Sequence, residues 1–135
     1  MKKVLILCTG NSCRSIIAEA LVNCHLRPRG IEAYSAGSNP GGRVNPDARR
    51  VLEEEGAWED TYHSKTIDEA MEKGPFDLVV TVCDNAKERC PLFPGDTKSI
   101  HVGFEDPDGK PYEVFVKTLR EIESRLLPRI EKELI

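Results

Sequence analysis

The feature that most constrains this chain is a short polar stretch between an apolar run and a helical pattern. Val4–Leu7 is entirely apolar, and Cys8–Ser15 follows it directly as Cys-Thr-Gly-Asn-Ser-Cys-Arg-Ser. Beyond this stretch the apolar residues recur with helical spacing, at Ile16, Ile17, Ala20, Leu21 and Cys24. The pattern therefore predicts a strand, a tight loop and a helix, with Cys8 at the carboxyl end of the strand.

The composition of this loop indicates an oxyanion site with a nucleophile at its base. A loop of this length can wrap one tetrahedral oxyanion, because its N–H groups and the following helix start both favour negative charge. Arg14 adds a guanidinium fork, and the Ser15 hydroxyl can donate to the Cys8 sulfur. These groups predict a Cys8 thiolate with a pKa below the usual value of about 8.5. The expected oxyanion-binding residues are Thr9, Gly10, Asn11, Ser12, Cys13 and Arg14. A buried cysteine beside a solvated arginine is the simpler alternative, which the complete string disfavours.

The length and charge of the chain narrow its architecture and its partners. A chain of 135 residues suits one domain, spanning residues 1–135. The net charge of -4, without a basic stripe, disfavours nucleic-acid binding. The sequence has neither a signal peptide nor an apolar run of the ~20 residues that a membrane span needs, so we expect a soluble, cytoplasmic protein. We also expect a monomer. Five cysteines, an odd number, then indicate reactive and buried thiols rather than a disulfide framework.

Strands and helices alternate along the chain, which predicts an α/β fold with a four-stranded parallel sheet and helices on both faces. Ligands bind such sheets at the carboxyl ends of the strands, so Cys8 and Cys83 belong on one edge. Asn45 should cap a helix that has Pro46 in its first turn, and Pro128 should kink the last helix. The expected strands are 3–7, 31–35, 77–82 and 99–102, and the main helices are 14–26, 68–73 and one opened by Pro111.

A second cysteine pair, Cys83 and Cys90, frames a polar segment. Zinc binding by these two with Cys8 and Cys13 is disfavoured, because the pairs are separated by four and six residues rather than the usual two to four. Two unrelated cysteines are the other alternative. We favour a redox shuttle, because Cys83 shares the sheet edge with the expected nucleophile.

The spacing of this pair also predicts a change of shape. If residues 83–90 form a helix, Cys83 and Cys90 lie about 10.5 Å apart along its axis, whereas a disulfide needs Cα atoms within about 7 Å. Oxidation must then unwind the segment. We expect faster hydrogen exchange between residues 83 and 98 after oxidation, and a protected first strand.

A loop after the fourth expected strand, Phe104-Glu105-Asp106-Pro107-Asp108-Gly109, supplies carboxylic acids at the same edge. One of them can protonate a leaving oxygen as a general acid. The sequence alone does not separate Asp106 from Asp108, and acid-rich loops are usually just solvated.

Over its whole length the chain resembles thioredoxin-coupled arsenate reductases, which share their fold with low-molecular-weight protein tyrosine phosphatases. The resemblance lies in Cys8–Ser15, Ser35-Ala36-Gly37, Val82-Cys83 through Cys90-Pro91, and Asp106-Pro107. The first loop fits both families, and the pair Cys83 and Cys90 points to the reductases.

The resemblance implies a three-cysteine relay that turns arsenate into arsenite, without a prosthetic group. Cys8 would attack arsenic, Arg14 would clamp the oxyanion and Asp106 would be the general acid. Asn11 would hold the loop and Ser15 would support the thiolate. Cys83 and then Cys90 would form the shuttle disulfide, which thioredoxin reduces. Phosphate and sulfate would compete as oxyanions.

Two alternatives belong to other functional classes. A phosphatase would need only Cys8, Arg14 and Asp106, but aromatic residues would be expected beside Asp106-Pro107, and the first one is Tyr112. An oxyanion-binding regulator would leave Cys83 and Cys90 unexplained.

The remaining polar residues are expected to be structural. Some related reductases bind potassium near Asn11, Glu19, Ser35 and an acid, but Lys65 stands where that acid would be, so no metal is predicted. Cys13 and Cys24 are expected to be structural, with Cys24 on the buried face of its helix. The histidines lack a paired carboxylate in the sequence and are interpreted as surface or edge residues: His25, His63 and His101.

Overall fold

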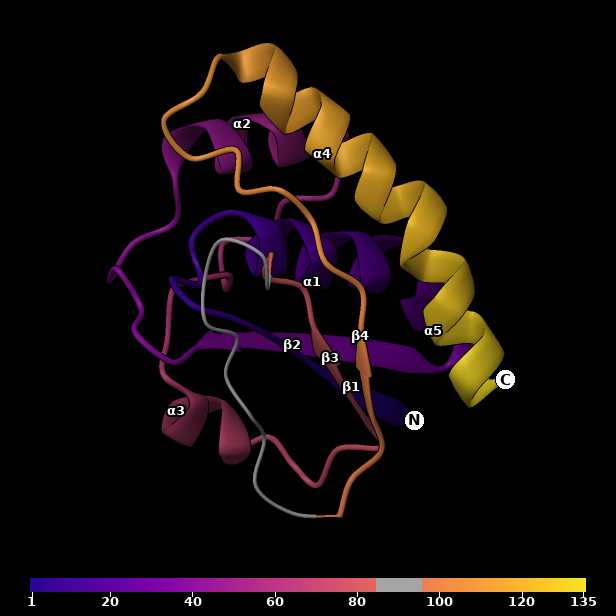
Figure 1. The fold of residues 1–135 in the computed structure, drawn as a ribbon. Helices are drawn as coiled ribbons and strands as arrows, with labels where there is room; N and C mark the ends of the chain where they lie inside the picture. The colour runs from indigo at the N-terminus through magenta and orange to yellow at the C-terminus, as the bar shows by residue number, and fades with distance from the viewer. Residues whose placement is uncertain (85–95) are drawn as a thin grey trace.

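The middle of the molecule is a parallel sheet with the strand order β2-β1-β3-β4. The structure is a computed structural model that describes residues 1–84 and 96–135. From β1 the chain continues to β2 on one side of the sheet and later returns to β3 on the other side of β1. The carboxyl ends of β1 and β3 therefore form the topological switch point, where ligands bind in sheets of this kind. The predicted α/β fold with four parallel strands is confirmed. The strands are β1 (Lys2–Cys8), β2 (Ile31–Gly37), β3 (Leu78–Thr81) and β4 (Ser99–His101), as Figure 1 shows.

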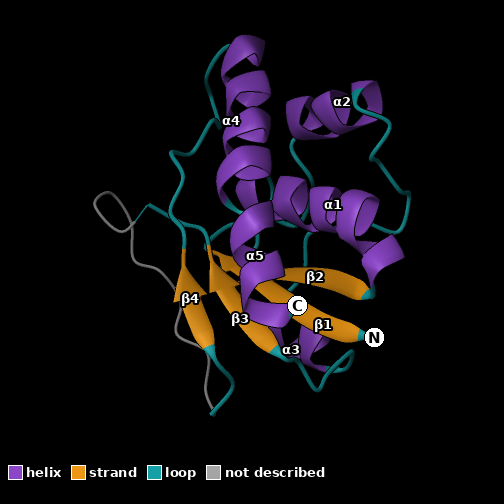
Figure 2. Cartoon of the chain, turned by 90° about the vertical axis from the view of Figure 1, so that its right-hand side faces the viewer, coloured by secondary structure: helices purple, strands orange, loops and turns teal. Residues whose placement is uncertain are grey.

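Helices cover both faces of the sheet, but unequally (Figure 2). Among residues 1–84 and 96–135, four helices lie on one face and α3 (Ile67–Met71) lies on the other. The larger layer also carries a short 3-10 helix, η1 (Arg27–Arg29), directly after its first member. The four helices of that layer are α1 (Arg14–Leu26), α2 (Pro46–Glu54), α4 (Tyr112–Arg125) and α5 (Leu127–Leu134).

Side chains of β1 alternate between the two faces and are buried on both. Val4 and Ile6 belong to the large core under the four helices, whereas Leu5 and Leu7 belong to a smaller core under α3. All four have 0% exposure, which explains why this strand is a continuous apolar run rather than an alternating one. The burial holds the carboxyl end of β1 rigidly, and Cys8 lies there.

Two helix boundaries follow the predicted local chemistry. The Asn45 side chain accepts a hydrogen bond from the Asp47 N–H at 2.8 Å, and Pro46 occupies the first turn of α2. At the other end of the chain, α4 ends at Arg125 and α5 begins at Leu127, with Pro128 in its first turn. The predicted kink is confirmed, because proline lacks the N–H that would continue one helix through this point.

The prediction that Cys24 is buried is wrong. Cys24 is exposed and lines an open groove with Gly56 and Trp58, because a loop rather than a packed helix lies opposite the last turn of α1. The neighbouring Asn23 is buried instead. Its amide accepts from the Ala33 N–H at 2.8 Å and donates to the Ala33 carbonyl at 3.1 Å, which satisfies the backbone of edge strand β2.

Two histidines also have carboxylate partners, contrary to prediction. His63 Nε2 lies 2.5 Å from Glu69, and His25 lies 3.5 Å from Glu123. Glu123 comes from α4, so the pairing of His25 depends on tertiary structure, whereas Glu69 is only six residues from His63. All three histidines are exposed, in agreement with their expected surface placement.

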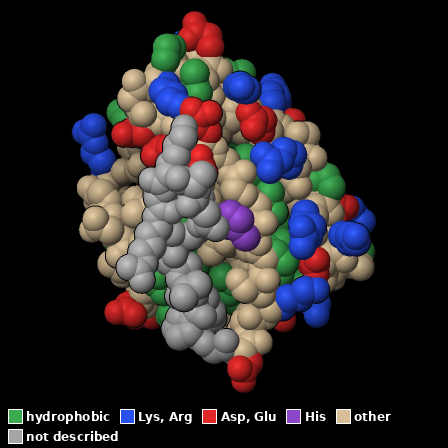
Figure 3. Space-filling view, in the orientation of Figure 1, with side chains coloured by type: hydrophobic (Ala, Val, Ile, Leu, Met, Phe, Trp, Pro, Cys, Tyr) green, Lys and Arg blue, Asp and Glu red, His purple; other side chains and the backbone are tan. Residues whose placement is uncertain are grey.

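Basic and acidic side chains are mixed on the face shown in Figure 3. In the described ranges, no helix is long and apolar enough to cross a membrane. Cys90 and most of the predicted 83–90 helix lie outside the described residues, so the expected unwinding stays a prediction.

Candidate active site

Asn11 holds the loop that follows β1. Its backbone has a φ of 48°, in the left-handed region that asparagine tolerates better than most residues. Its side-chain amide donates to Ser15 Oγ at 2.7 Å and to Ser35 Oγ at 3.0 Å, and its oxygen accepts from the Lys65 N–H at 2.9 Å. These three bonds join the loop to the start of α1, to β2 and to the segment before α3. Asn11 is fully buried, so they are shielded from water.

The Cys8 sulfur lies at the base of this loop between two polar groups. Ser15 Oγ is 2.9 Å from it, and the Asn11 N–H donates to it at 3.2 Å. Because Ser15 Oγ already accepts from the Asn11 side chain, its own hydrogen is available for the sulfur. The structure thus brings the predicted nucleophile and the predicted supporting hydroxyl into direct contact.

Burial raises the pKa of the Cys8 thiol above its ordinary value. The Ser15 hydroxyl, the Asn11 N–H and the Arg14 guanidinium lower it, but burial is the larger effect. The prediction of a lowered pKa is therefore wrong for this geometry. Cys13 is also buried, and burial raises its pKa to about 12, which keeps that thiol neutral.

The segment from Ser38 to Asn45 binds the backbone carbonyls of the loop. Its N–H groups donate to the carbonyls of Cys8, Thr9, Gly10 and Ser12 at 2.9–3.2 Å. Gly37 permits this close approach, because a Cβ there would lie 2.6 Å from the Thr9 carbonyl oxygen. These four carbonyls are thus satisfied by a neighbouring segment, while the Asn11 N–H donates to the Cys8 sulfur at the base of the loop.

Arg14 connects the loop to the acidic segment after β4. It is 3% exposed, and one guanidinium nitrogen donates to the Phe104 carbonyl at 3.1 Å. A second nitrogen lies 3.6 Å from Asp106 Oδ2. Both contacts hold the guanidinium beside the loop, where its fork can meet an anion. A small cavity joins the two segments, and its lining consists of Cys8, Gly10, Asn11, Ser12, Cys13, Arg14 and Asp106.

The structure separates the two aspartates that the sequence left equivalent. Asp106 lines the cavity with Cys8. Asp108 instead accepts a hydrogen bond from the Asn45 side chain at 2.7 Å, and its N–H donates to Asp106 Oδ1 at 3.0 Å. Asp106 is therefore the aspartate at the cavity, and Asp108 is engaged in holding the segment.

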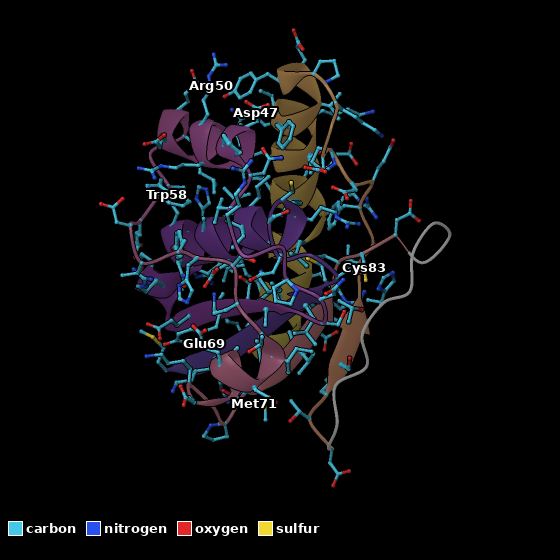
Figure 4. All side chains as sticks on the ribbon, turned by 90° about the vertical axis from the view of Figure 1, so that its left-hand side faces the viewer. Asp47, Arg50, Trp58, Glu69, Met71 and Cys83 are labelled. Carbon is cyan, nitrogen blue, oxygen red and sulfur yellow. The ribbon has the colours of Figure 1, made fainter. Side chains whose placement is uncertain are left out.

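Cys83 lies at the same sheet edge as Cys8. The Val82 N–H donates to the Leu7 carbonyl at 3.0 Å, so the residues that follow, Cys83 and Cys8, lie at neighbouring strand ends. Cys83 is fully buried and disulfide-bonded, whereas Cys8 is a free thiol. Figure 4 shows Cys83 beside a strand end, well apart from Glu69 and Met71 of α3. Cys90 lies outside the described residues.

A buried ion pair stands behind the loop. Glu19 Oε1 accepts from Ser35 Oγ at 2.6 Å and lies 3.9 Å from the Lys65 ammonium group. Burial raises the pKa of Glu19 to about 7, and Lys65 opposes that shift. The Lys65 ammonium thus lies beside the Glu19 carboxyl group. Among the described residues, no group of His, Cys, Asp or Glu side chains could hold a metal ion.

Sequence reasoning missed the roles of the Phe104 carbonyl and of Asn45 in the acidic segment. A carbonyl carries no side-chain signal, and Asn45-Pro46 was interpreted only as a helix start. The Asn45 side chain caps the helix with its oxygen and still has an NH₂ group that can donate to another residue. This unused donor was the one hint in the sequence of a second role.

Comparisons with known proteins agree with this geometry. Residues 3–134 match the family described as low molecular weight phosphotyrosine protein phosphatase. "Arsenate reductase 2" of Staphylococcus haemolyticus is 38% identical over 125 residues, which cover 93% of each chain. A crystal structure of an arsenate reductase from Archaeoglobus fulgidus has a TM-score of 0.81 at 33% identity, covering 95% of this chain and 98% of its own. The low molecular weight protein tyrosine phosphatase from T. tengcongensis has a TM-score of 0.80 at 30% identity, covering 98% and 99%.

A further solved structure carries a redox partner in its description. It is the thioredoxin-dependent arsenate reductase of Corynebacterium glutamicum, with a TM-score of 0.74 at 26% identity. The match covers 98% of this chain and 62% of that one.

Proposed function

This chain belongs to the low molecular weight phosphotyrosine protein phosphatase family, and from this premise we propose that it reduces arsenate to arsenite with thiols as the electron source. One observation supports the proposal: Cys8, a free thiol at the end of β1, lies at the strand end next to that of Cys83, which is disulfide-bonded. Hydrolysis of a phosphate ester needs the first cysteine alone. The relatives described as arsenate reductases support the same substrate.

The first step is attack on the bound oxyanion. Arsenate is held by the N–H groups of the loop and by Arg14, and the deprotonated Cys8 sulfur attacks arsenic. Asp106 gives a proton to the oxygen that leaves, which departs as water. Its place in the cavity beside Arg14 supports this role. Ser15 donates to the sulfur and opposes the effect of burial on its pKa.

The second step transfers the electrons. The Cys83 sulfur attacks the Cys8 sulfur, the arsenic–sulfur bond breaks, and its electron pair stays with arsenic, which leaves as arsenite. A Cys8–Cys83 disulfide results. Cys90 then attacks Cys83, which releases Cys8 as a thiol and leaves a Cys83–Cys90 disulfide. Two thiols are oxidised for each arsenic reduced, so the electrons balance without a prosthetic group.

Thioredoxin is the proposed reductant of the final disulfide. The disulfide state of Cys83 and the thioredoxin-dependent neighbour support this coupling. The inference that the protein works in the cytoplasm as a monomer rests on the sequence. Phosphate and sulfate are expected to compete for the loop, because they have the tetrahedral shape and charge of arsenate.

Hydrolysis of aryl phosphates is the second candidate function. The oxyanion loop, Arg14 and Asp106 are sufficient for it, and one solved neighbour is described as a protein tyrosine phosphatase. We expect it as a weak side activity of the same nucleophile, independent of Cys83.

Parallel assays of Cys83→Ser separate the two functions. The reductase proposal expects loss of thioredoxin-linked arsenate turnover and retention of aryl phosphate hydrolysis. Cys90→Ser should stop after one turnover with a Cys8–Cys83 disulfide, which mass spectrometry of the trapped protein detects. Cys24→Ser is the matched control, because Cys24 is exposed and free. Sustained thioredoxin-linked turnover by Cys90→Ser would refute the relay.

A further inference from the structure

The segment that carries Asp106 is held from two sides. Before Asp106, the Phe104 carbonyl accepts from Arg14 at 3.1 Å, and the Phe104 N–H donates to the Val82 carbonyl at 3.1 Å. After it, Asp108 is held by the Asn45 side chain at 2.7 Å. The Asp106 side chain itself is 49% exposed. Its direction therefore depends on these two attachments and on the Arg14 guanidinium, which lies 3.6 Å from Asp106 Oδ2.

Asn45 is the residue that joins this segment to the oxyanion loop. Its N–H donates to the Ser12 carbonyl at 3.0 Å, its side-chain oxygen caps α2, and its side-chain nitrogen donates to Asp108. The Asp108 N–H then donates to Asp106 Oδ1 at 3.0 Å. A path of hydrogen bonds thus runs from the oxyanion loop through Asn45 and Asp108 to the Asp106 carboxyl group, which lines the same cavity as Cys8.

We propose that Asn45 is a positioning residue for Asp106, acting through Asp108, in the reaction proposed above. Helix capping alone does not require asparagine, because aspartate and serine cap as well. Only asparagine, among these three, caps with an oxygen and still offers a nitrogen donor. In this structure that donor is the group that binds the Asp108 carboxylate to the start of α2.

The substitution Asn45→Asp removes the side-chain nitrogen that donates to Asp108 but keeps an oxygen that can cap α2. The new carboxylate can cap α2, but it faces Asp108 with a like charge and displaces it. For aryl phosphates with poor leaving groups, which need the acid most, we expect kcat to fall about three- to tenfold, a fraction of the ~10²–10⁴-fold effect of general acid catalysis. For good leaving groups the change should be less than about twofold. The dependence of rate on leaving-group pKa thus steepens, which loss of folded protein would not produce.

The double variant Asn45→Asp/Asp108→Asn reverses the hydrogen bond. Here the amide at position 108 donates to the carboxylate at position 45, so both the cap and the bridge are restored. We expect leaving-group dependence close to that of the wild type. Asp108→Asn alone keeps an acceptor for Asn45 and should change little. A wild-type slope in Asn45→Asp, or an equally steep slope in the double variant, would overturn the proposal.

A readout without turnover separates this inference from the proposed function. In the NMR spectrum of the full chain, the amide proton of residue 108 should lose its hydrogen-bonded shift in Asn45→Asp and regain it in the double variant. If the wild type turned over neither arsenate nor aryl phosphates, the proposed function would be wrong. The amide shift would still show whether the Asn45–Asp108 hydrogen bond holds the segment that carries Asp106. An unchanged amide shift in Asn45→Asp would refute the positioning role.

Discussion

The oxyanion loop and the acidic segment form one site, yet they are built in opposite ways. In the loop, Cys8, Asn11 and Ser15 are at most 2% exposed, and every contact described for Asn11 is short and internal. In the acidic segment, the Asp106 side chain is 49% exposed and is held through its neighbours. An anion cradle has to be organised before binding, because its backbone dipoles act only in fixed positions. An acid that releases a proton to a leaving group and regains one from water has to stay accessible.

The largest effect should come from the loop. Cys8→Ser should reduce both arsenate turnover and aryl phosphate hydrolysis to background, because the hydroxyl is a far weaker nucleophile than the thiolate. Steady-state assays with both substrates measure this, and Cys24→Ser serves as the control. If Cys8→Ser kept substantial turnover, the loop would only bind oxyanions.

Asp106→Asn tests the other side of the comparison. We expect aryl phosphate hydrolysis to slow by ~10²–10⁴-fold, as for loss of a general acid, with little change in phosphate affinity. Asp108→Asn should have a small effect, since an amide oxygen can still accept from Asn45. If the two effects were reversed, the assignment of the acid would be wrong.

Ser15→Ala should shift the pH dependence of the reaction. The hydroxyl favours the Cys8 thiolate, so its removal raises the thiol pKa further above its ordinary value. At any pH below that pKa the thiolate fraction then falls, and the ascending limb of the pH–rate profile moves to higher pH. A hydrogen bond to a charged group contributes about 1.5–3 kcal/mol, so we expect a shift of about one to two pH units. A shift in the acid direction would contradict the hydrogen-bond assignment.

Glu19, which lies behind the oxyanion loop, should give a smaller effect, and this effect is on the pH dependence of stability. The folded-state pKa of Glu19 is raised from 4.5 to about 7, so the folded state binds more protons than the unfolded state between these values. The contribution of Glu19 to stability is therefore fully present below pH 4.5 and is lost as the pH rises through 7. Glu19→Gln should remove this loss, worth about 2–3 kcal/mol between pH 5 and 8. Denaturant unfolding at the two pH values measures it, and an unchanged pH dependence would contradict the raised pKa.

The smallest expected effect is that of exchanging potassium for sodium in the assay buffer. Because the Lys65 ammonium lies 3.9 Å from Glu19, exchange of potassium for sodium at constant ionic strength should change kcat and KM by less than about twofold. Steady-state kinetics in the two salts decide this. A several-fold dependence on potassium would show that the ammonium does not replace an ion.

Local patterns were sufficient for most of the framework. The apolar run Val4–Leu7, the Asn45 cap and the Pro128 break each act within a few residues, and the structure confirms all three. The prediction that Cys24 is buried was wrong, because apolar spacing shows which residues share a helix face. It does not show where the neighbouring elements stop covering that face. The carboxylate partner of His25 was missed for a related reason, since Glu123 comes from the distant helix α4.

The candidate site divides in the same way. The string Cys8–Ser15 determined by itself that a thiol, a hydroxyl and a guanidinium would meet in one loop, because the residues of a strand–loop–helix turn are neighbours in space as well as in sequence. Only the tertiary structure decided that Asp106 rather than Asp108 lines the cavity, and that burial raises the Cys8 pKa. The first result depends on Asn45, which is distant in sequence and binds Asp108, and the second depends on how the folded chain excludes solvent from Cys8. Neither long-range hydrogen bonds nor solvent exclusion can be read from a local pattern, because both are set by packing.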